Sequence, residues 1–392
     1  MQKKGKTSSV LQNLGSLRDF KSATKRRLFL EEITQADLSH ISNPLLEEND
    51  LVHCENLIGS AMVPLGVAGP LEFKVIDESK WNYIPLATTE GALVASVSRG
   101  CKALSESGGV SVYAVSKGQT RGPVFATGSI EKGIFLQNWI EKNPRKLSRA
   151  AVSTSAHIKY LKARVKIIGS NTYVRFIFDT KDAMGMNMVT IASEEMVGLI
   201  TKATGIKCLT VAGNFDIDKK PAWLNVIDGR GYEIWAECVI PKKVLKEILR
   251  TSASELYSTW LSKCMVGSYA SGSLGYNAHF ANVLAAIFIA TGQDPAHVVE
   301  GSCGITICDV RGDDLYISIN IPALLVGTVG GGTVLPTQKA ALSIMGIDSK
   351  TSSKKLAEII GGAVLAGELS LLASLSSHTL GAAHKKLGRK KI

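Results

Sequence analysis

The chain has 392 residues, of which 45% are hydrophobic and 20% are charged. This is the composition of a globular protein with room for two or three domains, and it excludes a disordered chain. The net charge of +11 comes from the two ends, because residues 1–27 hold eight cations and one Asp, and residues 385–391 hold five cations. Basic ends on a nearly neutral body are typical of solvated tails or of segments that assist an anionic ligand. Most nucleic-acid-binding proteins carry a basic folded face instead, so nucleic acid is not expected as a partner.

The seven cysteines are odd in number and include no C-x-x-C pair. We therefore expect reduced thiols, no metal site and a cytoplasmic location. Two stretches without charged residues, 265–293 and 315–338, are too briefly apolar or too often interrupted by Gly and Pro to predict a membrane span. The lysine-rich N-terminus is not followed by the apolar segment of a signal peptide, so no membrane attachment is expected.

The first predicted elements are helical. Apolar residues at helical spacing predict a small helical segment within residues 1–54, and LATTEGALVASVSRGCKAL (86–104) predicts another helix. Thr88 or Thr89 would cap that helix, and Glu90 would lie in its first turn, where the helix dipole favours a carboxylate. This structural role accounts for Glu90 without any chemistry.

The middle of the chain predicts a separate α+β module over about residues 122–210, because β-branched residues alternate between turn glycines. NTYVRFIFDT (171–180) predicts a strand that places Val174, Phe176 and Phe178 on one face. EEMVGLITKATG (194–205) predicts a helix that ends at its final glycine.

Two glycine-containing motifs leave alternatives open. In TKDAMGMNMV (180–189) the methionines would fill gaps in the core, or they would form the floor of a binding site for a planar cofactor, with Asp182 and Asn187 as polar groups. GTVGGGT (327–333) would be a tight turn between buried strands, or a backbone that approaches a phosphate or a ring. It matches neither G-x-G-x-x-G nor the P-loop pattern.

The polar residues of GNFDIDKKPAWLN (213–225) would form an ordinary solvated turn, or Lys219 would be a buried cation that stabilises an oxyanion. An apolar helix is predicted over 277–291, with His279 and Asn282 on one face. Asp294 would begin the next helix, with Pro295 at its first position. A last helix is predicted over about 354–376, before a basic tail.

Together these motifs resemble the 3-hydroxy-3-methylglutaryl-coenzyme A (HMG-CoA) reductase family. The matching text occurs in the family's order between Glu55 and His384 and spans most of the chain. It comprises ENLIGSAMVPLGVAGPL, ATTEGALVASVSRGC, DAMGMNM, GNFDIDKKPAWLN, GYNAHFANVLAAIFIATGQD, GTVGGGT and LAGELSLLASLSSH. PLGVAGPL is similar to the class I branch of eukaryotes and archaea. With no membrane anchor evident before it, the chain resembles the soluble prokaryotic form.

The resemblance implies an α+β fold with three parts. A helical N-terminal segment, residues 1–54, would precede a large mixed α/β substrate domain around a long central helix, residues 55–121 and 211–392. A ferredoxin-like NADP(H)-binding domain, residues 122–210, would be inserted into it. Residues 55–59 resemble the family's dimerisation motif, so the resemblance also implies a homodimer or larger oligomer with active sites between subunits.

The family reduces HMG-CoA to mevalonate and free coenzyme A in two hydride steps that consume two NADPH, which supplies isoprenoid biosynthesis. This chemistry requires a cation at the developing oxyanion and acids for the oxygen and the departing thiolate. The motif match implies Lys219 as the cation, Glu90 as the proton-transferring carboxyl group, Asp294 as the group that bridges and tunes them, and His384 as the acid for the thiolate. A carboxyl that stays protonated near neutral pH requires burial or a neighbouring carboxylate, which Asp294 would supply for Glu90.

The same match implies the binding residues. Those expected to hold the hydroxymethylglutaryl group are Arg121, Asp218, Lys220, Lys263, His279 and Asn282. Those expected at the nicotinamide cofactor are Ser155, Asp182, Met184, Gly185, Met186, Asn187, Gly330, Gly331, Gly332, Thr333 and Arg389.

The sequence departs from the family pattern in three places. Ala212 stands where class I members often have a serine, the GSLGYN loop is one glycine short, and Ala156 replaces an arginine often found near the cofactor. The last change leaves NADH as the alternative to NADPH, unless Arg389 pairs with the 2′-phosphate. Two rival hypotheses are a catalytically silent CoA-binding protein of the same fold and a basic-tailed binder of nucleic acid or membrane surfaces.

Overall fold

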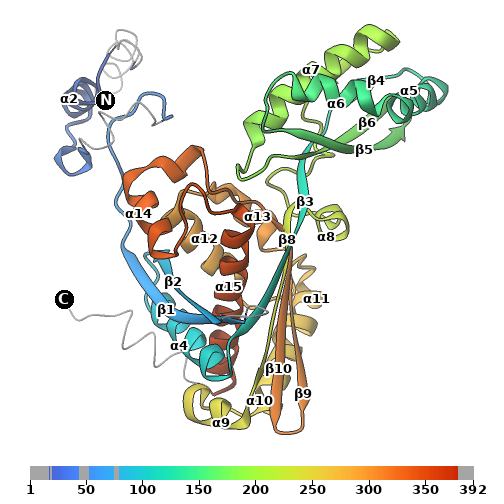
Figure 1. Cartoon of the computed structure of the whole chain (residues 1–392). Helices are drawn as coiled ribbons and strands as arrows, with labels where there is room; N and C mark the ends of the chain where they lie inside the picture. The colour runs from blue at the N-terminus through green and yellow to red at the C-terminus, as the bar shows by residue number, and fades with distance from the viewer. Residues whose placement is uncertain (1–16, 18–19, 44–52, 75–78, 378–392) are drawn as a thin grey trace, which may run out of the picture.

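The structure is a computed structural model that describes residues 17, 20–43, 53–74 and 79–377. An N-terminal segment with α2 (Ala23–Thr34) and the 3₁₀ turn η2 (Ser39–Ile41) lies on one side of a central body, and a smaller α/β unit lies on the other (Figure 1). Arg26 and Arg27 of α2 donate to the carbonyl oxygens of Leu57 and Ile58 at 2.7 Å each. These bonds tie the segment to the chain that leads into the body. The mixed α and β fold class expected from the sequence is confirmed.

One sheet, of ten strands within the described ranges, runs through both the body and the smaller unit, in the order β7-β4-β6-β3-β8-β10-β9. β3 (Val110–Arg121) joins the two units, because its first part pairs with β8 (Gly231–Ile240) and its last three residues pair with β6 (Asn171–Asp179). Four further strands extend the sheet within the body: β1 (Leu65–Lys74), β2 (Ser79–Ala87), β9 (Ile305–Arg311) and β10 (Asp314–Leu324).

The smaller unit follows a βαββαβ pattern with the antiparallel strand order β7-β4-β6-β5, which is that of a ferredoxin-like fold. Its other elements are β4 (Val124–Ala126), α5 (Ile130–Lys142), α6 (Pro144–Val152), β5 (Lys159–Ile168), α7 (Met186–Thr204) and β7 (Cys208–Thr210). Val174, Phe176 and Phe178 are fully buried on β6, as predicted. Their hydrophobic cluster shares no residue with the core of the body. That residues 122–210 bind a cofactor stays a prediction.

Helix α7 ends as predicted but begins earlier. Its C-terminal cap is Gly205 in the left-handed region, φ 71°, where glycine is favoured. Its first residue is Met186, so Met186 and Met188 lie in a helical turn and pack against the core of the smaller unit. The three alternating methionines therefore do not form a strand: Met184 lies in the loop before α7, and Met186 and Met188 lie in its first turn.

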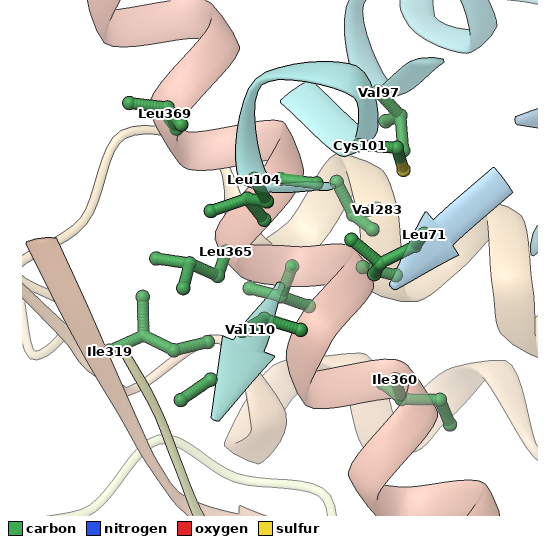
Figure 2. Packing of buried hydrophobic residues seen from close by; sticks show 14 of the residues in the cluster. Leu71, Val97, Cys101, Leu104, Val110, Val283, Ile319, Ile360, Leu365 and Leu369 are labelled. Atoms are coloured by element: carbon green, nitrogen blue, oxygen red, sulfur yellow. The ribbon is translucent and has the colours of Figure 1, made fainter. Parts of the chain in front are cut away.

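The body is built around α15 (Ser353–Ser376), within one residue of the predicted bounds. Figure 2 shows Leu365 and Ile360 of this helix among apolar side chains of α4 (Leu93–Glu106), α12 (Phe280–Thr291) and the sheet. A Cβ on Gly100 of α4 would lie 1.9 Å from the carbonyl oxygen of Ala366, so this glycine permits the two helices to touch. The helix is long and apolar enough to cross a membrane, but 83% of its most apolar window is buried, as expected of a core helix.

The remaining elements connect the sheet and the central helices. They are α8 (Trp223–Asp228), α9 (Lys242–Val244), α10 (Ala253–Trp260), α11 (Ser268–Ser271), α13 (Val298–Gly301) and α14 (Pro336–Ile344), the π-helical segments η3 (Leu245–Leu249) and η4 (Leu261–Gly267), and the 3₁₀ turns η5 (Pro295–His297) and η6 (Gly331–Val334). All seven cysteines are free thiols, as expected from their number and spacing.

Candidate active site

Lys219 and Asp294 form an ion pair, with 2.8 Å between Nζ and Oδ2. Lys219 lies in the loop before α8 with its backbone in the left-handed region, φ 55°. Asp294 follows α12 and caps η5, because its Oδ1 accepts the N–H of Ala296 at 3.0 Å and Pro295 takes the first position, as predicted. Two segments 75 positions apart in the sequence therefore meet at one salt bridge.

The pair keeps both groups charged. The hydrogen bond from Lys219 to Asp294 raises the pKa of the lysine, although burial opposes the shift. Burial alone would raise the pKa of Asp294, but the bonds from Lys219 and the Ala296 amide outweigh it and hold that pKa below its usual value. The side chains are 41% and 31% exposed, so a ligand can reach the ammonium group. A positioned cation of this kind suits a substrate oxygen that gains negative charge.

A buried charged network lies beneath this pair, and it was not predicted from the sequence. Arg230 Nη1 donates to Glu300 Oε1 at 2.7 Å, and its Nη2 donates to Asp218 Oδ1 at 2.9 Å. The ring of His297 lies with Nδ1 2.9 Å from the same Glu300 oxygen. Arg230, His297 and Glu300 are all fully buried. The sequence signal for it was a titratable residue at every third position from Asp294 to Glu300.

The ligand atoms of Asp218, His297 and Glu300 lie within 4.8 Å of one another, a spacing that suits a metal ion. The guanidinium group of Arg230 already contacts both carboxylates in this cluster. It supplies the positive charge that buried carboxylates require, so the cluster is explained as an ion-pair network.

Glu90 does not lie in the first turn of α4, which corrects the prediction. The helix begins at Leu93, and its cap is Ala92 in the left-handed region with no side-chain bond. Thr88 Oγ1 instead accepts the N–H of Glu90 at 2.9 Å and forms a turn before the helix. This turn leaves Glu90 exposed, and its two carboxylate oxygens accept from Asn282 Nδ2 at 3.2 and 2.9 Å. The helix-cap explanation of Glu90 is therefore wrong.

Glu90 and Asn282 line a groove of about 1620 Å³. The predicted residues Lys263 and His279 also line it, and His279 Nε2 is buried without a partner among the residues that the structure places. Sequence reasoning missed two further cations on the wall, Arg99 and Arg250. Glu90 is the one carboxylate on the described lining, so the groove is suited to an anionic ligand.

Asn282, which contacts Glu90, and Asp294 lie toward opposite ends of α12, and the groove wall also includes Pro221 and Val299. Asn282 is in the first turn of this helix, and Asp294 follows its end. Because an α-helix rises 1.5 Å per residue, the 12 residues of α12 separate its ends by roughly 18 Å. Among the described residues, Glu90 contacts Asn282 and Thr88, and the expected proximity of Asp294 to Glu90 stays a prediction.

Three other predicted substrate residues lie on the Lys219 side. Arg121 ends β3 and approaches Asp216 at 3.4 Å. Asp218 holds Arg230, as described above, and Lys220 is exposed, with its Nζ donating to the carbonyl oxygen of Asp218 at 3.3 Å. Burial raises the pKa of Asp216, and Arg121 opposes that rise.

The structure places the two motifs predicted to bind a cofactor side by side. Ala183 and Val329 form a parallel β-bridge, and the N–H of Thr328 donates to the carbonyl oxygen of Asp182 at 2.9 Å. A Cβ on Gly292, two residues before Asp294, would lie 2.2 Å from the carbonyl oxygen of Gly332. The glycine-rich loop therefore lies against the segment that carries Asp294.

The predicted cofactor residues differ in their surroundings. Asp182 accepts from the N–H and Oγ of Ser353 at 2.8 and 3.2 Å, so it also anchors α15. Met186 Sδ accepts from Arg230 Nη2 at 2.9 Å, and Asn187 is exposed in the first turn of α7. Ser155 lies in the turn between α6 and β5, where its Oγ accepts the His157 N–H at 3.1 Å. Thr333 Oγ1 donates to the carbonyl oxygen of Gly330 at 2.7 Å.

The start of α7 and the glycine-rich loop fit a dinucleotide. Gly185 caps α7 with φ 85°, and among the described residues this 19-residue helix has no side-chain cap bond. A helix N-terminus of this kind accepts a phosphate group. A Cβ on Gly330 or Gly331 would meet nothing within 4 Å, so that loop leaves open space beside it. His384 and Arg389 lie outside the described residues.

Comparison with known proteins agrees with this architecture. The fold is similar to that of the class II HMG-CoA reductase from Streptococcus pneumoniae, solved bound to NADPH in open conformations, with a TM-score of 0.69 over 91% of this chain and 97% of that one. At 18% identity, this likeness shows the fold alone. The fold is a mixed α and β architecture in which a ferredoxin-like unit follows β3.

The family model of hydroxymethylglutaryl-coenzyme A reductase matches residues 22–389. The 3-hydroxy-3-methylglutaryl-coenzyme A reductase of Methanothermobacter thermautotrophicus is 45% identical, with 93% of this chain and 92% of that protein covered. The reductases of Pyrococcus horikoshii and Aeropyrum pernix are 46% and 44% identical, over 93% and 97% of this chain and 91% and 92% of their own lengths. The chain belongs to the hydroxymethylglutaryl-coenzyme A reductase family.

Proposed function

We propose that this protein is an NADPH-dependent HMG-CoA reductase of the mevalonate pathway. The observation that carries the proposal is the Lys219–Asp294 ion pair, which a family member needs at the substrate carbonyl and which is assembled here at 2.8 Å. Lys219 holds the substrate oxygen and stabilises its negative charge as hydride arrives at carbon. Asp294 keeps Lys219 protonated through its direct hydrogen bond.

Glu90 is proposed to supply the proton to that oxygen. Asn282 holds the Glu90 carboxyl through two contacts from one amide, which fixes its direction. A positioned acid of this kind contributes about 10²- to 10⁴-fold to the rate. The family resemblance assigns the protonation of the coenzyme A thiolate to His384.

The groove at Glu90 is proposed to take the thioester substrate. HMG-CoA carries a carboxylate and several phosphate groups, and Arg99, Arg250 and Lys263 supply cations on the groove wall. His279 and Asn282 would hold the hydroxymethylglutaryl end. Arg121, Asp218 and Lys220 would contact it from the Lys219 side.

The cofactor is proposed to lie between the start of α7 and the glycine-rich loop. Bound there, NADPH supplies the hydride for each reduction step. The amides that follow Gly185 would bind a phosphate, while Gly330 and Gly331 leave room for the flat ring and Gly332 packs against Gly292. NADH is the alternative, and preference for NADPH would require a group such as Arg389 at the 2′-phosphate.

We also propose that the active site forms between two copies of the chain. The proposal is supported by the contacts of one chain, where Glu90 contacts Asn282 at the start of α12 and Asp294 contacts Lys219 beyond its end. A two-fold arrangement would place the groove of one copy against the Lys219–Asp294 pair of the other. The outer face of the sheet supports an interface, because Tyr113 and its cross-strand partner Trp235 are 57% and 38% exposed. The free cysteines support the proposed cytoplasmic location.

Oxidation of NADPH, followed by absorbance with purified protein and HMG-CoA, tests the proposal. NADH runs in parallel, and mevalonate and free coenzyme A are identified as products. Turnover with NADPH supports the assignment, and turnover with NADH alone corrects the cofactor. A folded dimer that binds HMG-CoA but turns over with neither cofactor would establish the silent CoA-binding protein instead.

A further inference from the structure

A closed circuit of contacts joins the two segments that carry the Lys219–Asp294 pair. Glu300 Oε1 accepts the backbone N–H of Lys219 at 3.1 Å and lies 2.9 Å from Nδ1 of His297. The other ring nitrogen of His297, Nε2, lies 3.7 Å from Asp294 Oδ2. That same oxygen lies 2.8 Å from Lys219 Nζ. The contacts therefore connect the backbone N–H of Lys219 to its own side-chain ammonium group through Glu300, His297 and Asp294.

The ring of His297 has a defined orientation within this circuit. An ionised carboxylate only accepts hydrogen bonds, so Glu300 places a proton on Nδ1. This leaves Nε2 as the atom that faces Asp294. His297 is fully buried, and its Nε2 has no hydrogen-bond partner in the described part of the chain. A buried polar atom in this state requires an explanation, because leaving it unpaired is unfavourable.

We propose that His297 is a positioning residue of the reductase that holds the Asp294 carboxylate against Lys219 through its Nε2. The inference rests on the proposed function, since the pair matters to catalysis only in that reaction. A proton on Nε2 donates toward Oδ2 and attracts the carboxylate. When that proton is absent, the two facing atoms are both acceptors and the contact is repulsive. The strength of the Lys219–Asp294 pair therefore depends on the ring nitrogen of His297 that faces Asp294.

Charged groups surround the ring in the described part of the chain. Three carboxylates face it: Glu300 and Asp294 as above, and Asp218, whose Oδ1 lies 4.0 Å from Nδ1. Two cations, Arg230 and Lys219, contact those carboxylates. The nearby thiol of Cys303 stays neutral, because burial and then Glu300 raise its pKa.

Two substitutions test the two ring nitrogens of His297 one at a time. In His297→Asn the amide takes the place of Nδ1, keeps the bond to Glu300 and presents nothing to Asp294. In His297→Gln the amide reaches the position of Nε2 and gives Asp294 a donor that does not titrate. We expect His297→Asn to lower kcat by about 10- to 100-fold with little change in KM for HMG-CoA, because a small misplacement of a catalytic group has effects of that size. His297→Gln should retain most of kcat and lose the part of the pH profile that belongs to the ring.

The matched control is His40→Asn, at an exposed histidine of the N-terminal segment, and circular dichroism confirms that each variant is folded. Equal kcat losses in both His297 variants with an unchanged pH profile, or wild-type behaviour in both, would overturn the proposal.

If a variant fails to fold, nuclear magnetic resonance of ring-labelled histidines in the wild-type protein and in Asp294→Asn decides the question. The His297 ring signal should titrate at a different pH in Asp294→Asn, and identical titration would contradict the contact. Absence of turnover in the wild-type enzyme would instead remove the proposed function.

Discussion

Lys219 Nζ lies 2.8 Å from Asp294 Oδ2, so a cation and an anion remote in sequence share one hydrogen bond. The bond raises the pKa of Lys219 and, against the effect of burial, lowers the pKa of Asp294. In Asp294→Asn, Lys219 loses the main cause of its raised pKa. We expect kcat to fall by about 100-fold or more, as for a group that supports proton transfer. The alkaline limb of the kcat/KM profile should also move to lower pH, and a limb at the wild-type position would contradict the assignment.

The same pair predicts a pH dependence of stability. A lysine with a raised pKa stabilises the fold below its unfolded-state value, and this contribution is lost as pH rises through the folded-state pKa. An aspartate with a lowered pKa stabilises the fold above its unfolded-state value, and this contribution is lost as pH falls through the folded-state pKa. The difference in unfolding free energy between wild type and Asp294→Asn should therefore be largest between about pH 4 and 10. Denaturant unfolding at a series of pH values measures it, and a difference that grows below this range would refute the account.

The contact between Glu90 and Asn282 predicts a graded loss of activity. Glu90→Gln keeps the shape of the side chain but has no acidic proton, so NADPH oxidation should fall by about 10²- to 10⁴-fold. Asn282→Ala leaves the acid in place and releases it from its hydrogen bonds, so a smaller loss is expected. A Glu90→Gln enzyme with near wild-type kcat would exclude Glu90 as the acid.

The packing of α4 on α15 predicts a large effect from one methyl group. A Cβ at Gly100 would lie 1.9 Å from a backbone oxygen of α15, so Gly100→Ala forces the helices apart. We expect a loss of about 1–3 kcal/mol in the free energy of unfolding, as in other overpacked cores. The matched control is Gly198→Ala in α7, where a Cβ meets nothing within 4 Å. That change should stabilise the helix slightly. Equal unfolding midpoints for the two variants would contradict the close approach.

Buried carboxylate Glu368 predicts an effect on the substrate groove. It accepts the N–H groups of Ala278 and His279 at 2.8 and 2.7 Å and the hydroxyl of Thr306 at 2.6 Å, which fixes the start of α12. Glu368→Gln turns an N–H group toward these donors. The expected loss is about 1–3 kcal/mol of stability, with KM for HMG-CoA raised because His279 and Asn282 shift. Thermal unfolding and kinetics on one preparation check both, and unchanged values in both would show that the bonds contribute little.

Local patterns in the sequence predicted the elements that local forces determine. The buried face of β6, the glycine that ends α7, the long α15 and the cap at Asp294 follow from residue spacing and turn chemistry. The motif resemblance predicted the candidate site residues, but the sequence could not show how they are placed around α12. Glu90 was misplaced because capping rules favoured Thr88 or Thr89, whereas the chain makes a turn and starts the helix at Leu93. His297, Glu300 and Arg230 were missed because their role depends on distant segments packing together.

The most direct test of the divided active site is complementation between inactive variants. Glu90→Gln and Lys219→Met are each purified, shown to be folded and inactive, and then mixed after reversible dissociation. If the site combines Glu90 of one copy with Lys219 of another, mixed dimers contain one intact site. Random mixing should then restore about a quarter of wild-type NADPH oxidation. A mixture that forms mixed dimers, verified by mass, and stays inactive would contradict the account.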